Sequence, residues 1–422
     1  MSSRRMRPWR ALLRGDAKAR SLDTVAAIVN DLRQPARDAS LARGSAGLAV
    51  LFDYLSRRKP AGGETAVRCL DAAVNQVASR RMAPSFFSGF TGVAWAAEHL
   101  KRTVTAAPED GNRDIDRVLN DYLTGSPRLA EYDLVDGLVG FGVYALERLP
   151  RRSAVVCLSR VVEQLNRTAR RTPDGATWMT RAEKIDRASA RRHHPACYYD
   201  LGLAHGVTGV IALLGATCAA GVAVKKARPL LASAVSWLMA QKQPPGTGST
   251  FSNLVAPGEV GSPSRSAWCY GDPGIAAALL VAARGAGEPA WEREALALAR
   301  RAATRPPEEA GVRDAGLCHG AAGLAHIFNR LFQATGDRSL GRASRFWFER
   351  AMEMRQPGRG IGGFQALTFP CGRPVWRDEP GLLTGAAGIA LALLAACSNQ
   401  EPEWDRFLLL SFRSQRSQAL PT

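Results

Sequence analysis

The chain has 422 residues, of which 46% are hydrophobic and 22% are charged. This ordinary globular mixture excludes a disordered or fibrous chain, and the length permits a sizeable core. Lys and Arg number 56 against 38 Asp and Glu, a formal net charge of +18 that favours an acidic partner. An arginine-rich genome would produce the same excess. Because the basic residues are spread along the chain and no nucleic-acid motif accompanies them, we expect no nucleic-acid binding.

The sequence carries no sign of a membrane segment. No apolar run is long enough to span a bilayer, and no signal-peptide-like stretch follows the start MSSRRMRPWRALLRG. Eight cysteines are too few for the disulfide scaffold of a secreted protein. We therefore expect a cytoplasmic protein without stable membrane insertion, in which clustered cysteines serve as metal ligands or nucleophiles.

A Gly-x-x-Gly pair followed by an apolar run occurs seven times, at intervals of 45–69 residues. Runs such as GLAVLFDYL, GVIALLGA and GIALALLAA are apolar on every side, which predicts buried helices. The glycine pairs are Gly44/Gly47, Gly89/Gly92, Gly137/Gly140, Gly206/Gly209, Gly271/Gly274, Gly320/Gly323 and Gly385/Gly388.

More amphipathic segments, with apolar residues at three- and four-residue spacing, precede several glycine-led helices. Seven such pairs predict an all-α fold, an (α/α)₇ toroid whose seven inner helices wall a central cavity and whose seven outer helices face water. Strand signal is confined to Gly175–Met179 and Phe364–Phe369. We expect a basic N-terminal segment at 1–20, a single toroid domain at 21–415 and a tail at 416–422. The amphipathic segments are Ser21–Gln34, Glu64–Arg80, Ala227–Gln241, Trp291–Ala303 and Leu340–Arg355.

Connections from outer to inner helices are long in the second half of the chain. An alternating double ring places all of them at one end, and long loops gathered at one mouth are typical of a binding site. We expect a substrate to enter there, steered by basic side chains. The loops are Arg171–Gly202, Lys242–Ala267, Thr304–Gly316 and Gln356–Leu382, and they carry Arg181, Arg187, Arg191, Arg192, Arg359 and Arg373.

Equivalent positions of neighbouring repeats should lie side by side around the ring. His205 and His319 directly precede the first glycine of repeats four and six, and Cys269 and Cys318 stand one position earlier in repeats five and six. This alignment brings Cys269, Cys318 and His319 together at the mouth, with His205 in the same column as His319. Two thiolates and an imidazole suit zinc, and three protein ligands leave a fourth position open, as in catalytic zinc sites. We predict one zinc ion per chain at these three residues.

Several segments resemble a known family. They are AHGVTG (Ala204–Gly209), WCYGDPG (Trp268–Gly274), CHGAAG (Cys318–Gly323) and TGAAG (Thr384–Gly388), and they resemble the lanthionine synthetase C-like family, the lanthipeptide cyclases. The resemblance covers nearly the whole chain. It implies an α,α-toroid with zinc in its cavity. It also implies an enzyme that adds peptide cysteine thiols to dehydroalanine or dehydrobutyrine, forming thioether rings in a ribosomally made precursor.

The same resemblance implies roles for individual residues. It supports the three zinc ligands, makes His205 the acid–base group, and adds Asp133, Arg265 and Tyr270 to the site. A thiol addition builds negative charge on the amide oxygen beside the alkene, which an Arg, a Tyr hydroxyl or a protonated His can stabilise. Asp136 is a second candidate for the acid, and the sequence does not decide between it and Asp133.

Three functions stay open. Nothing in the chain resembles a dehydratase, kinase or lyase domain, so we expect a stand-alone cyclase. It would act after a separate dehydratase on a dehydrated precursor peptide, whose leader we expect to be acidic. A glutathione-adding relative would use the same zinc chemistry with a different thiol donor. A non-catalytic scaffold that binds a leader peptide is the third, and an intact set of zinc ligands argues against it.

Overall fold

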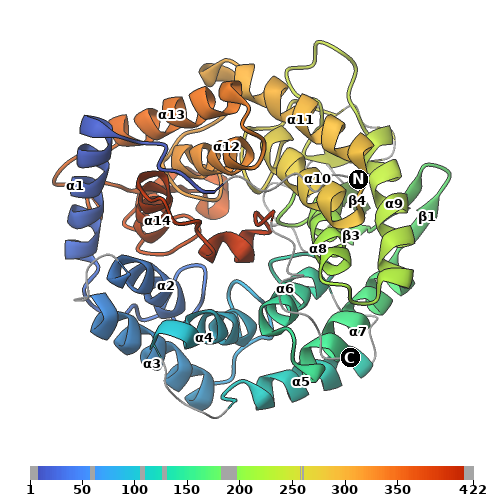
Figure 1. The fold of residues 1–422 in the computed structure, drawn as a ribbon, viewed down its shortest axis with the longest axis horizontal. Helices are drawn as coiled ribbons and strands as arrows, with labels where there is room; N and C mark the ends of the chain where they lie inside the picture. The colour runs from blue at the N-terminus through green and yellow to red at the C-terminus, as the bar shows by residue number, and fades with distance from the viewer. Residues whose placement is uncertain are drawn as a thin grey trace.

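The computed structural model describes residues 8–57, 62–104, 110–125, 131–181, 197–256, 258 and 261–412, without the side chains at 102–104, 181 and 371. These residues form fourteen α-helices in two concentric rings (Figure 1). The chain alternates between the rings, which confirms the predicted all-α double toroid. The outer helices are α1 (Gly15–Asp31), α3 (Gly63–Ser79), α5 (Arg113–Thr124), α7 (Arg152–Thr168), α9 (Val224–Ala240), α11 (Pro289–Thr304) and α13 (Arg338–Glu353). The inner helices are α2 (Ser45–Ser56), α4 (Phe90–Val104), α6 (Leu138–Arg148), α8 (Val207–Ala219), α10 (Asp272–Ala286), α12 (Ala321–Thr335) and α14 (Ala386–Cys397).

The inner and outer helices differ in how much of their surface is buried. Every residue of the inner helix α14 is buried, whereas the outer helix α5 turns one face inward through Leu119 and Leu123. The five predicted amphipathic segments are all helical, with ends that differ from the prediction by one to six residues. The largest difference is in α1, which begins at Gly15 rather than Ser21. The additional residues Gly15–Arg20 include no buried side chain, so they do not register in an apolar pattern.

A closed circle of backbone hydrogen bonds joins the starts of the inner helices. In every repeat, the residue two positions before the first glycine accepts N–H groups from the preceding repeat at 2.8–3.4 Å. The last repeat donates to the first, so the circle closes and equivalent residues of neighbouring repeats lie side by side. The accepting carbonyls, in ring order, belong to Ala42, Phe87, Val135, Ala204, Cys269, Cys318 and Leu383.

Glycine is required where each inner helix begins, because the preceding turn folds back against the helix. A Cβ atom on Gly323 would lie 1.8 Å from the carbonyl oxygen of Leu317. Gly271 adopts a φ of +98°, a conformation that other residues rarely take, and a Cβ there would lie 1.8 Å from the carbonyl oxygen of Arg265. The recurring Gly-x-x-Gly pair is therefore a packing requirement of the turn.

The long loops meet at the end of the ring where the inner helices begin, and they carry short antiparallel strands. Strands near residues 175–179 and 364–369 confirm the predicted strand signal. One small sheet draws its strands from two different loops and so ties those loops together. The strands are β1 (Arg170–Thr172), β2 (Gly175–Thr177), β3 (Thr180–Arg181), β4 (Cys197–Asp200), β5 (Leu254–Val255), β6 (Ala366–Thr368) and β7 (Val375–Arg377), in sheets β1–β2, β3–β4–β5 and β6–β7.

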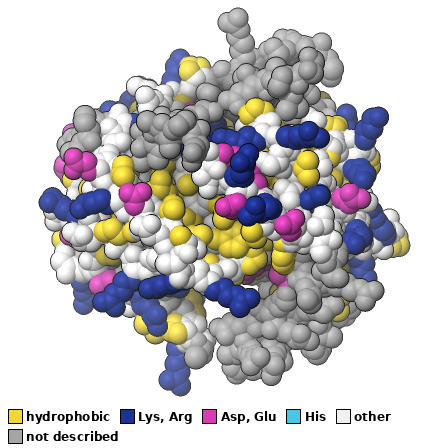
Figure 2. Space-filling model, turned by 90° about the horizontal axis from the view of Figure 1, so that it is seen from below, with side chains coloured by type: hydrophobic (Ala, Val, Ile, Leu, Met, Phe, Trp, Pro, Cys, Tyr) yellow, Lys and Arg dark blue, Asp and Glu magenta, His cyan; other side chains and the backbone are white. Residues whose placement is uncertain are grey.

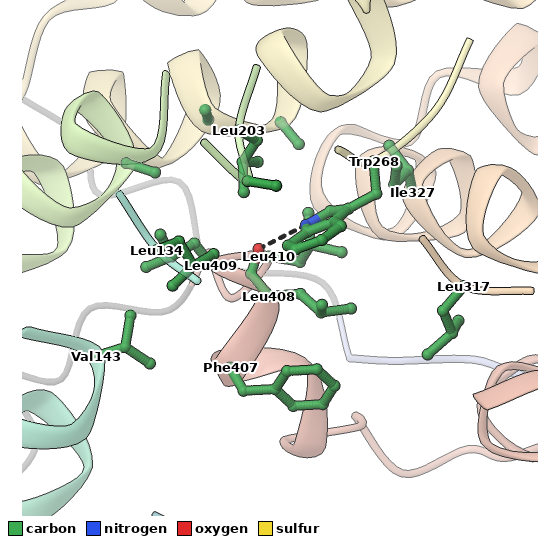
Figure 3. Packing of buried hydrophobic residues seen from close by; sticks show 14 of the residues in the cluster. Leu134, Val143, Leu203, Trp268, Leu317, Ile327, Phe407, Leu408, Leu409 and Leu410 are labelled. Atoms are coloured by element: carbon green, nitrogen blue, oxygen red, sulfur yellow. Dashed lines mark hydrogen bonds between the residues drawn. The ribbon is translucent and has the colours of Figure 1, made fainter. Parts of the chain in front are cut away.

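The C-terminal segment enters the space that the inner helices surround (Figure 3). It includes the 3₁₀ helix η6 (Trp404–Leu408), whose Phe407 packs edge-on against Phe87 and Trp95. The indole N–H of Trp268 donates to the carbonyl oxygen of Leu408 at 3.0 Å. The expected central cavity is therefore partly filled by the chain itself.

Two inner helices, α8 and α10, come into backbone contact at Gly215 and Gly285, where a Cβ on Gly285 would lie 1.9 Å from the carbonyl oxygen of Gly215. We expect Gly285→Ala to lower the free energy of unfolding by about 1–3 kcal/mol, since the two backbones must separate. Chemical denaturation measures this. Gly63→Ala is the control, because nothing lies within 4 Å of a Cβ there, and it should be neutral or stabilise by up to about 1 kcal/mol. Unchanged stability of Gly285→Ala would contradict the close approach.

Candidate metal centre

Cys269, Cys318 and His319 come together at the mouth of the ring, as the alignment of repeats predicts. Each offers one ligand atom, and these atoms all lie within 4.8 Å of one another. The circle of backbone hydrogen bonds produces this proximity, since the Cys269 N–H donates to the Cys318 carbonyl oxygen at 3.3 Å. No fourth His, Cys, Asp or Glu joins the cluster among the described residues. A metal ion held here would keep a coordination position for another ligand.

The chemistry of these side chains fits a soft metal ion. The Cys318 S–H donates toward the Cys269 sulfur, and this contact, together with His319, holds the pKa of the Cys269 thiol well below its usual range. Cys318 retains the shared proton, so its pKa is raised. Cys269 is buried, while Cys318 and His319 are partly exposed toward the mouth. Such a pair of sulfur atoms shares a proton that a bound cation would displace.

Asp314 lies behind the cluster and was not predicted from the sequence. Its Oδ2 is 3.7 Å from Nε2 of His319 and also accepts the N–H of Leu367, in β6, at 3.1 Å. Its Oδ1 accepts the N–H of Gly316 at 3.2 Å. A buried carboxylate next to a histidine ligand is a common means of fixing the ring orientation at metal sites.

His205 and Asp133 form a pair beside the cluster. Nδ1 of His205 lies 2.7 Å from Oδ2 of Asp133, while Oδ1 of Asp133 accepts the N–H of Asp136 at 2.8 Å. Burial disfavours the imidazolium, but the hydrogen bond and charge of Asp133 outweigh it and raise the pKa of His205 to about 9. Asp136 is exposed. Of the two acids that the sequence left open, Asp133 is the one bonded to His205.

Tyr270 and Arg265 lie on the turn that carries Cys269. The Tyr270 hydroxyl donates to Oδ2 of Asp200 at 2.7 Å, and Asp200 is buried. Arg265 is exposed, and among the described residues its guanidinium has no carboxylate partner. Its positive charge nevertheless contributes to the lowered pKa of Cys269. The structure therefore brings all seven predicted site residues to one region of the mouth.

Asp200 and Asp314 occupy the same position in their repeats, six residues before the first glycine. This signal was available in the sequence, because five of the seven repeats carry an acid there. In four of them the side chain accepts the N–H of the residue two positions on, which stabilises the turn before the inner helix. The acids are Asp38, Glu131, Asp200, Asp314 and Glu379.

The basic charge of the chain is dispersed. On the face shown in Figure 2, Lys and Arg side chains are spread out, with acidic side chains among them. Of the loop arginines expected to steer a substrate, Arg359 and Arg373 are exposed. Arg187, Arg191 and Arg192 lie outside the described residues, as does the side chain of Arg181.

Fold and site together define an all-α double toroid with a cysteine–cysteine–histidine cluster at its mouth. Residues 35–409 match the family model for the lanthionine synthetase C-like protein, so the chain belongs to that family. Among solved structures it is similar to nisin cyclase, with a TM-score of 0.74 and 18% sequence identity over 93% of this chain and 97% of that chain. At this identity the likeness establishes the shared fold. Within the described residues, no helix is long and apolar enough to cross a membrane.

The His205–Asp133 pair predicts a measurable titration. Because the pKa of His205 is raised from 6.5 to about 9, the pair should stabilise the fold fully below pH 6.5 and lose this effect as the pH rises through 9. Asp133→Asn should lower the pKa of His205, measured by NMR titration of its ring. Asp136→Asn is the matched control and should shift it less. An unchanged His205 titration in Asp133→Asn would contradict the pairing.

Proposed function

We propose that this protein is a zinc-dependent lanthipeptide cyclase. It adds cysteine thiols of a dehydrated precursor peptide to dehydroalanine or dehydrobutyrine, which forms lanthionine and methyllanthionine rings. The observation that carries the proposal is the meeting of the Cys269–Cys318–His319 cluster with the Asp133–His205 pair at one mouth. Membership of the lanthionine synthetase C-like family and the structural likeness to a protein named nisin cyclase support it.

Zinc is the metal that this donor set favours. Two cysteine sulfurs and one imidazole are its common ligands, and a site with three protein ligands is the usual catalytic form. Bound there, zinc supplies a Lewis acid that lowers the pKa of a thiol entering the open position. Cys269, Cys318 and His319 would hold it, with Asp314 behind His319.

The residues around the cluster handle the proton and the charge of the reaction. The substrate thiol loses its proton to solvent and its sulfur forms a bond to the β-carbon of the alkene, whose electron pair moves toward the amide oxygen. Arg265, which has no carboxylate partner among the described residues, would provide a positive charge for that oxygen. His205, protonated at neutral pH because its pKa is about 9, donates a proton to the α-carbon. Asp133 holds the ring of His205 in place for this transfer.

The alkene must be made before the thiol adds to it, so the reaction needs a separate dehydratase. We propose that both proteins act in the cytoplasm. Basic loop residues such as Arg359 and Arg373 would attract an acidic leader. A glutathione-adding enzyme is the second candidate function, since the same cluster would accept that thiol equally well.

One experiment separates these functions. The purified protein is incubated with a dehydrated, cysteine-containing precursor and glutathione, and the product is alkylated and weighed by mass spectrometry. Before alkylation, ring formation leaves the peptide mass unchanged, whereas glutathione addition raises it. Alkylation then counts the remaining thiols, and each ring formed removes one. If the peptide keeps every thiol and gains no mass, the protein is a scaffold and both enzymatic proposals fail.

The zinc assignment predicts one zinc ion per chain in the wild type. Cys269→Ala/Cys318→Ala should lose it, because one histidine alone does not hold zinc tightly. Metal analysis of both proteins measures this, and circular dichroism should show that the toroid, which has its own core, stays folded. Near-stoichiometric zinc in the double variant would show that other residues bind the metal.

A second variant separates the acid–base role from metal binding. His205→Ala should keep its zinc, because His205 is paired with Asp133 rather than placed in the cluster. Ring formation should fall by about 10²–10⁴-fold, the usual contribution of a general acid or base. Alkylation of the remaining thiols over time measures the rate. Wild-type rates would remove His205 from the mechanism, and loss of zinc would make it a ligand.

A further inference from the structure

Asp200 links the loop sheet to the metal centre. It ends β4 and pairs with Leu254 of β5, so the antiparallel sheet fixes its backbone. Its side chain is buried, with the residue 2% exposed. Oδ1 accepts the N–H of Gly202 at 2.7 Å, and Oδ2 accepts the hydroxyl proton of Tyr270 at 2.7 Å. Each carboxylate oxygen therefore has one assigned donor.

The Tyr270 side chain has little freedom to adopt another arrangement. Its ring lies on Gly202, where a Cβ atom would come within 2.7 Å of Cε1 of Tyr270 and 2.5 Å of the carbonyl oxygen of Cys269. A phenol has one proton to donate, and here that proton points to Asp200. Tyr270 is one residue from the proposed zinc ligand Cys269, and among the described residues no hydrogen-bond donor is directed at its hydroxyl oxygen.

We propose that Asp200 is a positioning residue for the cyclase reaction. By taking the hydroxyl proton of Tyr270, it holds the oxygen of that side chain as a hydrogen-bond acceptor for a backbone N–H of the substrate peptide. The proposal rests on the proposed function and changes the role that the family resemblance implies for Tyr270. While it donates to Asp200, its hydroxyl does not donate to the developing oxyanion, and that task falls to Arg265.

The charge state of Asp200 agrees with this arrangement. Burial raises its pKa, the Tyr270 hydroxyl and the Gly202 N–H oppose the rise, and the pKa settles at about 6. His205 favours the charged carboxylate and Asp133 disfavours it. At neutral pH and above, Asp200 is therefore ionised and can only accept hydrogen bonds.

Asp200→Asn reverses the hydrogen bond without changing the shape of the side chain. The Gly202 N–H requires an acceptor, so the side-chain amide oxygen of the new asparagine faces Gly202 and its N–H₂ group faces Tyr270. The Tyr270 hydroxyl then has to accept rather than donate. Asp38→Asn is the matched control, because Asp38 occupies the same position in repeat one and accepts the N–H of Ser40 at 2.7 Å in the same turn.

A double-mutant cycle tests the proposal with the zinc-loaded protein and a dehydrated precursor at pH 7.5. Asp200→Asn and Tyr270→Phe should each lower kcat/KM by about 10- to 100-fold, the effect of losing a charge-assisted hydrogen bond, and KM should rise because a contact with the substrate backbone is lost. If Asp200 acts through Tyr270, the double variant should be no slower than the slower single variant. Zinc content should match the wild type, and Asp38→Asn should keep wild-type activity.

A spectroscopic measurement gives a readout that does not depend on catalysis. With 3-fluorotyrosine incorporated, the ¹⁹F signal of residue 270, assigned by its loss in Tyr270→Phe, should shift in Asp200→Asn and not in Asp38→Asn. An unshifted signal, or additive rate losses in the double variant while the wild type forms rings, would overturn this proposal alone. A wild-type protein that forms no rings would overturn the proposed function and this proposal with it.

Discussion

The site depends on the closed circle of backbone hydrogen bonds that joins the starts of the seven inner helices. Main-chain groups set the relative height of neighbouring repeats, so the geometry of the mouth is independent of which side chains occupy it. Trp268 and Cys269 donate to the carbonyl oxygen of Cys318 in the next repeat, and this places the sulfur atoms of the two cysteines side by side. A metal bound there would use a site that the backbone already provides, unlike a zinc finger, which needs its metal in order to fold.

The same circle of backbone hydrogen bonds explains how much of the site can be predicted from the sequence. Because the Gly-x-x-Gly pairs give the register, aligning the repeats correctly places Cys269, Cys318 and His319 together and predicts the double toroid. Asp200 and Asp314 escape notice because an acid before a turn is ordinary. Only the fold shows that the second oxygen of each carboxylate reaches a residue of the metal centre. The strands in the loops are short, and the pairing of β4 with β5 joins two different loops, so it leaves little local signal.

The path of the C-terminal segment was equally invisible to sequence patterns. Trp268 donates to a carbonyl 140 residues further along the chain, and no local pattern encodes such a contact. Asp405 anchors the segment through buried contacts with Arg330 at 2.6 Å and His326 at 2.7 Å. Buried ion pairs add little net stability, but removal of one partner is costly because it leaves a charge unpaired. These contacts therefore fix where the segment lies, and through Leu408 they support the turn that carries Cys269.

At the mouth the carboxylates are engaged with neighbouring residues, while one guanidinium is exposed. Three carboxylates lie near the cluster, and each faces a different residue of the site rather than the open coordination position. Since each is directed toward a hydrogen-bond donor or a ring nitrogen, they contribute little repulsion toward an incoming thiolate. Arg265, by contrast, lacks a carboxylate partner among the described residues. The imidazolium of His205 is already paired with Asp133, which leaves the exposed guanidinium of Arg265 to meet an incoming anion. An enolate oxygen formed in a thiol addition would be such an anion. The pairs are Asp133 with His205, Asp200 with Tyr270, and Asp314 with His319.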